Sequence, residues 1–122
     1  MAELHDFSNP RNLYEKLIRD GEKLNVEVNG DNVFNFVSSA FHLQHWIKNS
    51  PLIGSEVMKR ILKRISSDES IKLCESIARA KQSFMVELDE NGSRIIVGDL
   101  SIDVFEMRNH IINQYDSYFK SK

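Results

Sequence analysis

Apolar positions three and four residues apart predict that most of this chain is helical. The clearest segment runs from about Asn32 to Lys48, where apolar side chains occupy almost every side of the expected helix. Asp31 can cap its beginning, and Pro51 follows its end because proline cannot continue a helix. A helix that is apolar all round is normally buried among other helices. We therefore expect this segment, which ends near Trp46, to be the dry centre of the fold.

The same periodicity predicts a helix on each side of the central segment. The first begins at Pro10, because proline suits the first helical position and Asn9 can cap it. The next covers roughly Ser55 to Ile65 and carries its charged residues on one face. A loop from Asn25 to Gly30 separates the first helix from the central one.

A fourth helix and a last one are expected further along the chain. Ser66, with Glu69 three residues later, has the form of a capping box, so the fourth helix should start there and run to about Ser83. Asp103 can cap the last helix. Its apolar stripe consists of Val104, Met107, Ile111, Tyr115 and Tyr118.

Between these two helices the pattern changes to alternation, which is typical of strands. The segments FMVEL and RIIVGDLSI predict two short strands, and Asn91-Gly92 favours a hairpin turn between them because both residues tolerate positive φ. A two-stranded hairpin is marginal alone. We therefore expect it to pack against the helices or to pair its edge with another chain, which includes a homodimer through that edge. The residues expected to pack are Met85, Leu88, Ile95 and Val97.

These elements predict a mainly α-helical single domain over residues 1–122: a bundle of about five helices with a β-hairpin inserted before the last helix. A chain of 122 residues buries enough surface to fold without a metal or a disulfide. Cys74 is the single cysteine, which fits a reducing compartment. The first residues, MAELHDFSNP, lack the apolar core of a secretory signal, and no segment is apolar enough to span a membrane. We expect a cytoplasmic protein with no membrane partner.

The net charge of −2 excludes global basicity as an argument for nucleic acid or anionic membrane. A local basic patch is nevertheless present on the third helix, where four cations spaced by three and four residues cover a broad face. Such a face is usually only solvated, but it can also bind an acidic partner protein or nucleic-acid phosphates. We expect a protein partner, with nucleic acid as the alternative. The four cations are Lys59, Arg60, Lys63 and Arg64.

Candidate polar chemistry is concentrated on two helices. His42 and His45 lie three residues apart and can share a metal, for which His110 would be a third ligand. No HExxH or Glu-x-x-His pattern accompanies them, so we expect partly buried histidines whose hydrogen bonds are satisfied, and no metal or cofactor. Arg108 and His110 form the best polar pair on the last helix. However, they point about 200° apart on an ideal helix and cannot both face one small site.

Catalytic motifs are absent from the sequence. Cys74 lies on an apolar helical stripe, where burial suppresses the thiolate and makes the residue inert packing. There is no GxSxG motif, no phosphate-cradling glycine loop and no dinucleotide fingerprint. We therefore expect no catalytic residue, and a protein that is not an enzyme.

Two segments, AFHLQHWIKNSP and LCESIARAKQS, resemble a group of uncharacterised bacterial helical proteins with a His-Leu-x-Asp-Trp-like motif. His42, Leu43 and Trp46 match that motif, and His45 replaces its aspartate. In the second segment Cys74 matches, whereas the polar positions of that group's motif are changed. The group is reminiscent of HEPN-like bundles, many of which are RNA-cutting toxins or their inactive relatives. Their hallmark is an arginine four to six residues before a histidine on a late helix, and no histidine here has one.

We therefore expect a non-enzymatic protein-interaction or regulatory module of bacterial or mobile-element type, such as an immunity protein, an antitoxin or an inhibitor. One alternative is a HEPN-like RNA-acting protein, degenerate in the sense that it lacks the family's motif. It would use the Lys59 to Arg64 face for phosphates and His110 for chemistry. Another alternative is a metal-binding helical bundle that uses His42 and His45.

Overall fold

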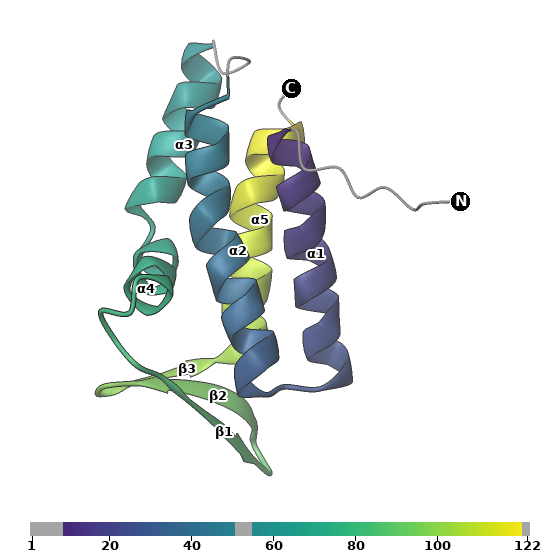
Figure 1. Ribbon diagram of the computed structural model, residues 1–122, viewed down its shortest axis with the longest axis vertical. Helices are drawn as coiled ribbons and strands as arrows, with labels where there is room; N and C mark the ends of the chain where they lie inside the picture. Colours follow the sequence, from purple (N-terminus) through teal and green to yellow (C-terminus); the bar gives the residue numbers. More distant parts are fainter. Residues whose placement is uncertain (1–8, 51–54, 121–122) are drawn as a thin grey trace.

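The computed structural model describes residues 9–50 and 55–120 of the 122-residue chain. These residues form five helices and a three-stranded antiparallel sheet that precedes the last helix, which confirms the expected fold class. Figure 1 shows α1, α2, α3 and α5 running roughly alongside one another, the short helix α4 seen nearly end-on, and the sheet across one end of the bundle. The helices are α1 Pro10–Val26, α2 Gly30–Lys48, α3 Glu56–Ser67, α4 Glu69–Ala78 and α5 Val104–Lys120, and the strands are β1 Met85–Asp89, β2 Gly92–Val97 and β3 Leu100–Asp103.

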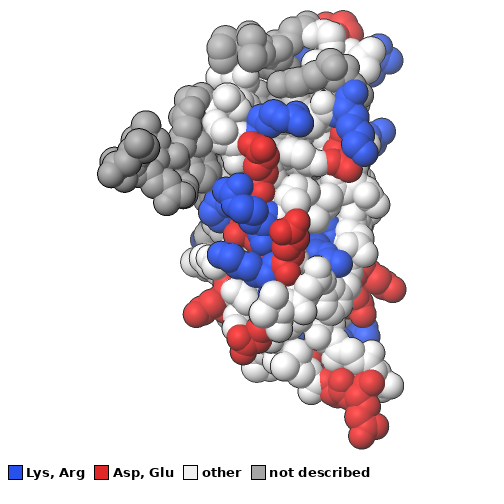
Figure 2. Space-filling model, turned by 90° about the vertical axis from the view of Figure 1, so that its right-hand side faces the viewer, with Lys and Arg blue, Asp and Glu red and all other residues white. Residues whose placement is uncertain are grey.

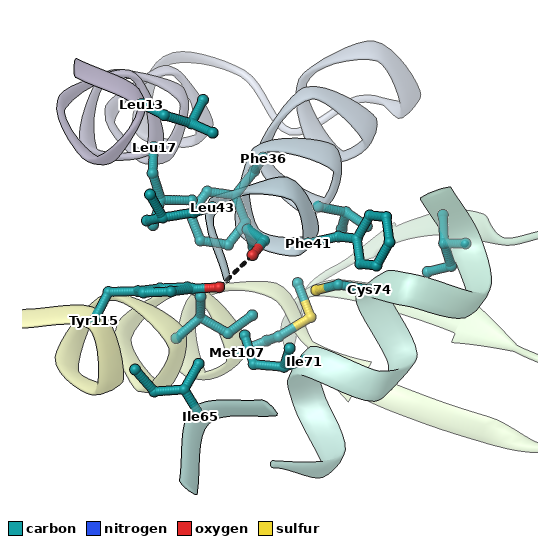
Figure 3. Close-up of a cluster of buried hydrophobic side chains, with 14 of the residues drawn as sticks. Leu13, Leu17, Phe36, Phe41, Leu43, Ile65, Ile71, Cys74, Met107 and Tyr115 are labelled. Carbon is teal, nitrogen blue, oxygen red and sulfur yellow. Dashed lines mark hydrogen bonds between the residues drawn. The ribbon is translucent and has the colours of Figure 1, made fainter. Parts of the chain in front are cut away.

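The helix α2 lies at the centre of the bundle, between α1 and α4, as its apolar pattern predicts (Figure 1). Its inner positions have no solvent exposure, and they meet buried side chains of the other helices (Figure 3). Both aromatic ends of the expected dry segment, Phe34 and Trp46, are nevertheless exposed. The segment is therefore the centre of the hydrophobic core, but part of its surface is exposed to solvent. Its buried apolar residues are Val33, Phe36, Val37, Ala40, Phe41, Leu43 and Ile47.

Each helix begins at a capping residue, and the cap of α2 is one of two that differ from the prediction. Asn9 caps α1 as expected. The cap of α2 is Asn29, whose side chain accepts a hydrogen bond of 2.8 Å from the N–H of Asn32. Asp31 lies inside the first turn instead, where its charge favours the helix dipole. Both residues are good capping types, so the sequence did not distinguish them. Pro51 lies outside the described residues.

The junction between α3 and α4 also differs from the prediction. Ser66 does not cap α4, because it still belongs to α3. Asp68 is the cap, and its carboxylate accepts hydrogen bonds from the N–H groups two and three residues later. The helix α4 ends at Ala78 rather than near Ser83. Ala80 adopts a φ of +60°, which interrupts the helical path.

The sheet has three strands, whereas the sequence predicted a hairpin of two. The segment RIIVGDLSI does not form a single strand, because Gly98 adopts a φ of +57° and the chain turns back on itself. The strand β3 then pairs with β2 in antiparallel register. The tip of the hairpin between β1 and β2 is Glu90-Asn91, one residue before the predicted Asn91-Gly92 pair, and of that pair only Gly92 has a positive φ.

The register decides which side of the sheet meets the helices. Val86, Ile95 and Ile102 are paired across the three strands and lie on the inner face. We expected Met85 and Leu88 to pack against the helices, and this was wrong: they are 67% and 62% exposed. Met85 belongs to the opposite face. Leu88 shares the face of Val86 but lies two pairs nearer the turn, where the helices do not cover it.

The last helix matches the prediction closely. The Asp103 carboxylate accepts hydrogen bonds of 3.0 and 2.9 Å from the N–H groups of Phe105 and Glu106. The whole predicted stripe, from Val104 to Tyr118, is buried. Among the described residues, no helix combines the length and the apolar character needed to cross a membrane.

Candidate functional site

The outer face of α3 carries the exposed cations that the sequence singled out. Ser55 caps this helix, and its opposite stripe, Met58, Leu62 and Ile65, is buried in the core. Because the apolar stripe fixes the rotation of the helix, the charged positions between its members project away from the bundle. They are Lys59, Arg60, Lys63 and Arg64, and all four are exposed.

This basic face is largely without compensating acidic groups. Lys59 Nζ lies 3.7 Å from the Glu56 carboxylate, which is a weak exposed contact. Within the described residues, Arg60, Lys63 and Arg64 make no ion pair. Three positive charges within two helical turns therefore remain available to an outside group.

The basic face borders a shallow, open hollow of about 500 Å³. Apolar side chains are mixed with the charges there: Val57 is exposed and Ile61 is half-buried. A surface that combines guanidinium groups with apolar area is typical of protein interfaces, in which arginine is enriched. The hollow is lined by Val57, Arg60, Ile61, Lys63, Arg64 and Ser67.

His110 belongs to a separate polar cluster at the junction of three helices. Its Nε2 lies 2.6 Å from Oδ2 of Asp68, and the same oxygen accepts a hydrogen bond of 3.1 Å from Gln114. The other carboxylate oxygen caps α4. The carboxylate thus orients an imidazole whose side chain is 48% exposed, and it ties α5 to the start of α4.

Sequence reasoning missed the partner of His110. Asp68 is 42 residues away in the chain, and no local spacing connects the two. The available signal was Asp68 itself, a good capping residue next to the predicted helix junction. It does not indicate which side chain the carboxylate meets.

Arg108 makes contacts on another side of α5 from His110. Its guanidinium donates hydrogen bonds to the backbone carbonyl of Gly21, at 3.2 Å, and to the side chain of Asn25, at 2.6 Å. It also lies over the ring of Phe105, 4.8 Å from the centroid. Arg108 therefore links α5 to α1. The helical spacing predicted that Arg108 and His110 would not face one small site, and their separate partners fit that geometry.

His42 and His45 are exposed on α2 rather than partly buried as expected, and both contact the buried ring of Phe41. Their imidazoles lie 4.9 and 5.0 Å from the ring centroid of Phe41. No group of three His, Cys, Asp or Glu side chains able to hold a metal occurs in the part of the chain that the structure describes. The four polar candidates therefore have three different surroundings rather than a common pocket.

Cys74 is fully buried in the core (Figure 3). Burial, together with a smaller effect of the negative charge of Asp68, raises the pKa of the Cys74 thiol from 9.0 to about 12. At neutral pH the thiol is therefore protonated and a poor nucleophile. Its environment fits the packing role predicted from the sequence.

A buried ionic cluster between α1 and α2 was not anticipated. Asp20 is 3% exposed, and its carboxylate lies 2.6 Å from the ammonium of Lys16. The hydroxyl of Ser39 donates a second hydrogen bond to it, at 2.7 Å. Lys16 also reaches Ser39 at 2.8 Å, which closes a three-membered network. Since these three side chains hydrogen-bond to one another, the cluster is better explained as a link between α1 and α2 than as a ligand-binding site.

Comparisons of the chain with protein-family models, with curated proteins and with solved structures found no match. The candidate surfaces are therefore compared by their geometry and chemistry. By these criteria the basic face of α3 is the strongest, because it is exposed, charged and largely unpaired.

Proposed function

We propose that this protein is a non-enzymatic protein-interaction or regulatory module of bacterial or mobile-element type, such as an immunity protein, an antitoxin or an inhibitor. The basic face of α3 carries this proposal. Exposed cations that are largely without acidic partners among the described residues attract an acidic partner, speed its encounter and fix its orientation. The buried Cys74 and the internally bonded Asp20 and Arg108 leave this face as the best-placed surface for function.

A protein partner fits this face better than nucleic acid does. Val57 and Ile61 lie among the cations, and they favour a partner that offers apolar area. Single-stranded nucleic acid is usually held by aromatic side chains on which its bases stack, and the hollow contains none. The net charge of −2 also opposes general binding to phosphates.

Charge reversal on α3 tests this proposal. The double variant Arg60→Glu, Arg64→Glu should lose a partner that the wild type captures from an extract of its own host. Arg19→Glu, Lys23→Glu is a matched control, because it has the same spacing and charge change on exposed positions of α1. The partner is then identified by mass spectrometry and titrated in purified form at increasing salt.

We expect capture by the wild type and by the control, at least tenfold weaker binding by the α3 variant, and affinity that falls with salt. Equal capture by all three proteins would reject the α3 face. Recovery of RNA in place of an acidic protein would favour the second candidate function.

That second candidate is an RNA-acting protein, and one specific observation favours it. His110 is half-exposed and is held 2.6 Å from a carboxylate, an arrangement that can orient an imidazole for proton transfer. Incubation with labelled single-stranded RNA at low salt tests this alternative. If the wild type cuts RNA, His110→Ala should abolish cutting while the protein stays folded. If the wild type leaves the RNA intact, this candidate is rejected.

A further inference from the structure

The strand β1 is an edge of the sheet. It pairs with β2 on one side, and within the described chain no strand pairs with its other side. Four of its five residues are exposed, and Val86 is the half-buried exception. An edge of this kind presents backbone N–H and C=O groups that can accept a further strand.

An apolar groove lies where the chain enters β1. Its volume is about 330 Å³, and Phe34 of α2 and Phe84 supply its aromatic walls. Because Phe84 immediately precedes Met85, the groove and the edge strand are continuous. We name the groove together with β1 the edge-and-groove surface. The groove is lined by Phe34, Ile77, Ala80, Gln82, Ser83 and Phe84.

The charge of this surface is opposite to that of α3. Glu87, Asp89 and Glu90 are exposed on β1 and at the turn after it. Figure 2 shows acidic side chains gathered at the end of the molecule that the sheet forms. Arg94 is the one basic residue in the three strands, and its guanidinium donates to the hydroxyl and the carbonyl of Ser101. The edge is therefore acidic, with exposed apolar side chains at Met85 and Leu88.

We propose that the edge-and-groove surface binds an extended, basic segment of a partner protein, which adds a fourth strand beside β1. Backbone hydrogen bonds to β1 would supply affinity, as in other cases of strand addition. Alternate lysine or arginine side chains of the segment would face Glu87 and Asp89. A large apolar side chain at one end would enter the groove beside Phe34.

A second copy of this chain fits the edge poorly. If two β1 strands paired in antiparallel fashion about Glu87, that residue would face its own copy, and Met85 would face Asp89. Like charges placed directly opposite each other destabilise a strand pair. The acidic residues therefore oppose the homodimer that the exposed edge alone would allow, and they favour a basic segment.

This surface is separate from the basic face of α3, so the two proposals can fail independently. The test is a titration of ¹⁵N-labelled protein, followed by NMR, with peptides of alternating lysine and valine that carry phenylalanine at either end. Matching peptides with glutamate in place of lysine are the charge control. Amide exchange is measured with and without peptide, because a new strand should protect outward-facing amides of β1.

We expect shift changes concentrated in β1 and residues 82–84, slower amide exchange in β1, and no comparable effect of the glutamate peptides. The variant Glu87→Lys, Asp89→Lys should weaken binding at least tenfold, whereas the same charge change at Glu15 and Glu22 on α1 should not. Leu88→Ser should weaken binding, whereas Leu100→Ser, at an equally accessible leucine on the other edge strand, should not. Phe34→Ser removes one aromatic wall of the groove and should also weaken binding.

Three results would overturn the proposal. The first is a set of shift changes located away from β1 and the groove. The second is equal binding of lysine and glutamate peptides. The third is a dimer in sedimentation experiments that Leu88→Ser dissociates, because that would assign the edge to a second copy of the chain.

Discussion

The hydroxyl of Tyr115 in α5 donates a hydrogen bond to the backbone carbonyl of Ala40 in α2, in the middle of the hydrophobic core (Figure 3). Both residues are fully buried. Burial raises the pKa of Tyr115 well above its usual value, and the nearby Cys74 adds to the shift. The hydroxyl therefore stays protonated and remains a donor. This bond ties the last helix of the chain to its central one.

Tyr115→Phe should lower the free energy of unfolding by about 1 kcal/mol, the typical net value of a buried hydrogen bond. The loss stays modest because the Ala40 carbonyl lies within a helix and keeps its bond to the N–H four residues later. Urea denaturation at neutral pH measures it. Tyr14→Phe is the control: it keeps the ring that stacks on Phe119 at 4.3 Å, and stability should be unchanged. Equal stability of all three proteins would contradict the role given to the Tyr115 bond.

The raised pKa of the Cys74 thiol predicts that the protein becomes less stable at alkaline pH. Burial raises the pKa of its thiol from 9.0 to about 12, so the unfolded chain releases this proton at a lower pH than the folded chain does. The contribution of the thiol to stability is complete below pH 9 and is lost as the pH rises toward 12. The slope per group is at most about 1.4 kcal/mol per pH unit. Tyr115, whose pKa is also raised, adds to the decline above pH 10.

Cys74→Ala removes one of these two titrating groups. Its free energy of unfolding should therefore fall less steeply than that of the wild type in urea denaturations between pH 9 and 10.5. The free energy of unfolding of the wild type should therefore approach that of Cys74→Ala steadily as the pH rises over that range. Parallel pH profiles would show that the thiol does not titrate differently in the folded and unfolded states.

The accuracy of the sequence prediction depends in part on the range of the interactions involved, although the local caps of α2 and α4 were also assigned to the wrong residue. Asn9 and Asp103 cap their helices through contacts within three residues, and both caps were predicted correctly. The pairing of Asp68 with His110 spans 42 residues and depends on how α4 and α5 pack, so no periodicity contains it. The same holds for the link from Arg108 to α1.

Burial on the sheet shows the same limit. The alternation of residues 84–88 predicts a strand, but it leaves open which face meets the helices. Pairing of Val86 with Ile95 decides this and places Met85 on the outer face. Leu88 lies on the inner face but is exposed because the helices do not reach that far toward the turn. The basic face of α3 could be predicted because amphipathic periodicity alone fixes it. The edge-and-groove surface could not, since Phe34 and Phe84 meet only in the folded chain.

Two glycines give a matched test of backbone conformation. Gly92, at the hairpin turn, adopts a φ of +129°, which side chains rarely allow, so Gly92→Ala should destabilise the protein by about 1 kcal/mol or more. Gly30 begins α2 without a positive φ, and an added Cβ there would meet nothing within 4 Å. Gly30→Ala should therefore be neutral or slightly stabilising. Thermal denaturation of the two variants measures the contrast, and similar midpoints would contradict it.

The buried cluster of Asp20, Lys16 and Ser39 predicts a strongly non-additive response to mutation. Lys16→Met removes the cation and leaves a carboxylate that is 3% exposed with Ser39 as its remaining side-chain partner. Removing one member of a buried ion pair costs about 3–5 kcal/mol. The Lys16 side chain is 37% exposed, so water partly replaces it, and we expect a loss of about 2–3 kcal/mol.

The double variant Lys16→Met, Asp20→Leu separates an unpaired charge from lost packing. Because it also removes the buried carboxylate, it should be more stable than Lys16→Met alone. Lys120→Met is the surface control: its ammonium lies 3.4 Å from Asp116 and is mostly exposed, so its loss should change stability by less than about 0.5 kcal/mol. Urea denaturation of the four proteins completes the comparison. If the double variant were less stable than Lys16→Met, the unpaired Asp20 carboxylate would not be the cause of the stability that Lys16→Met loses.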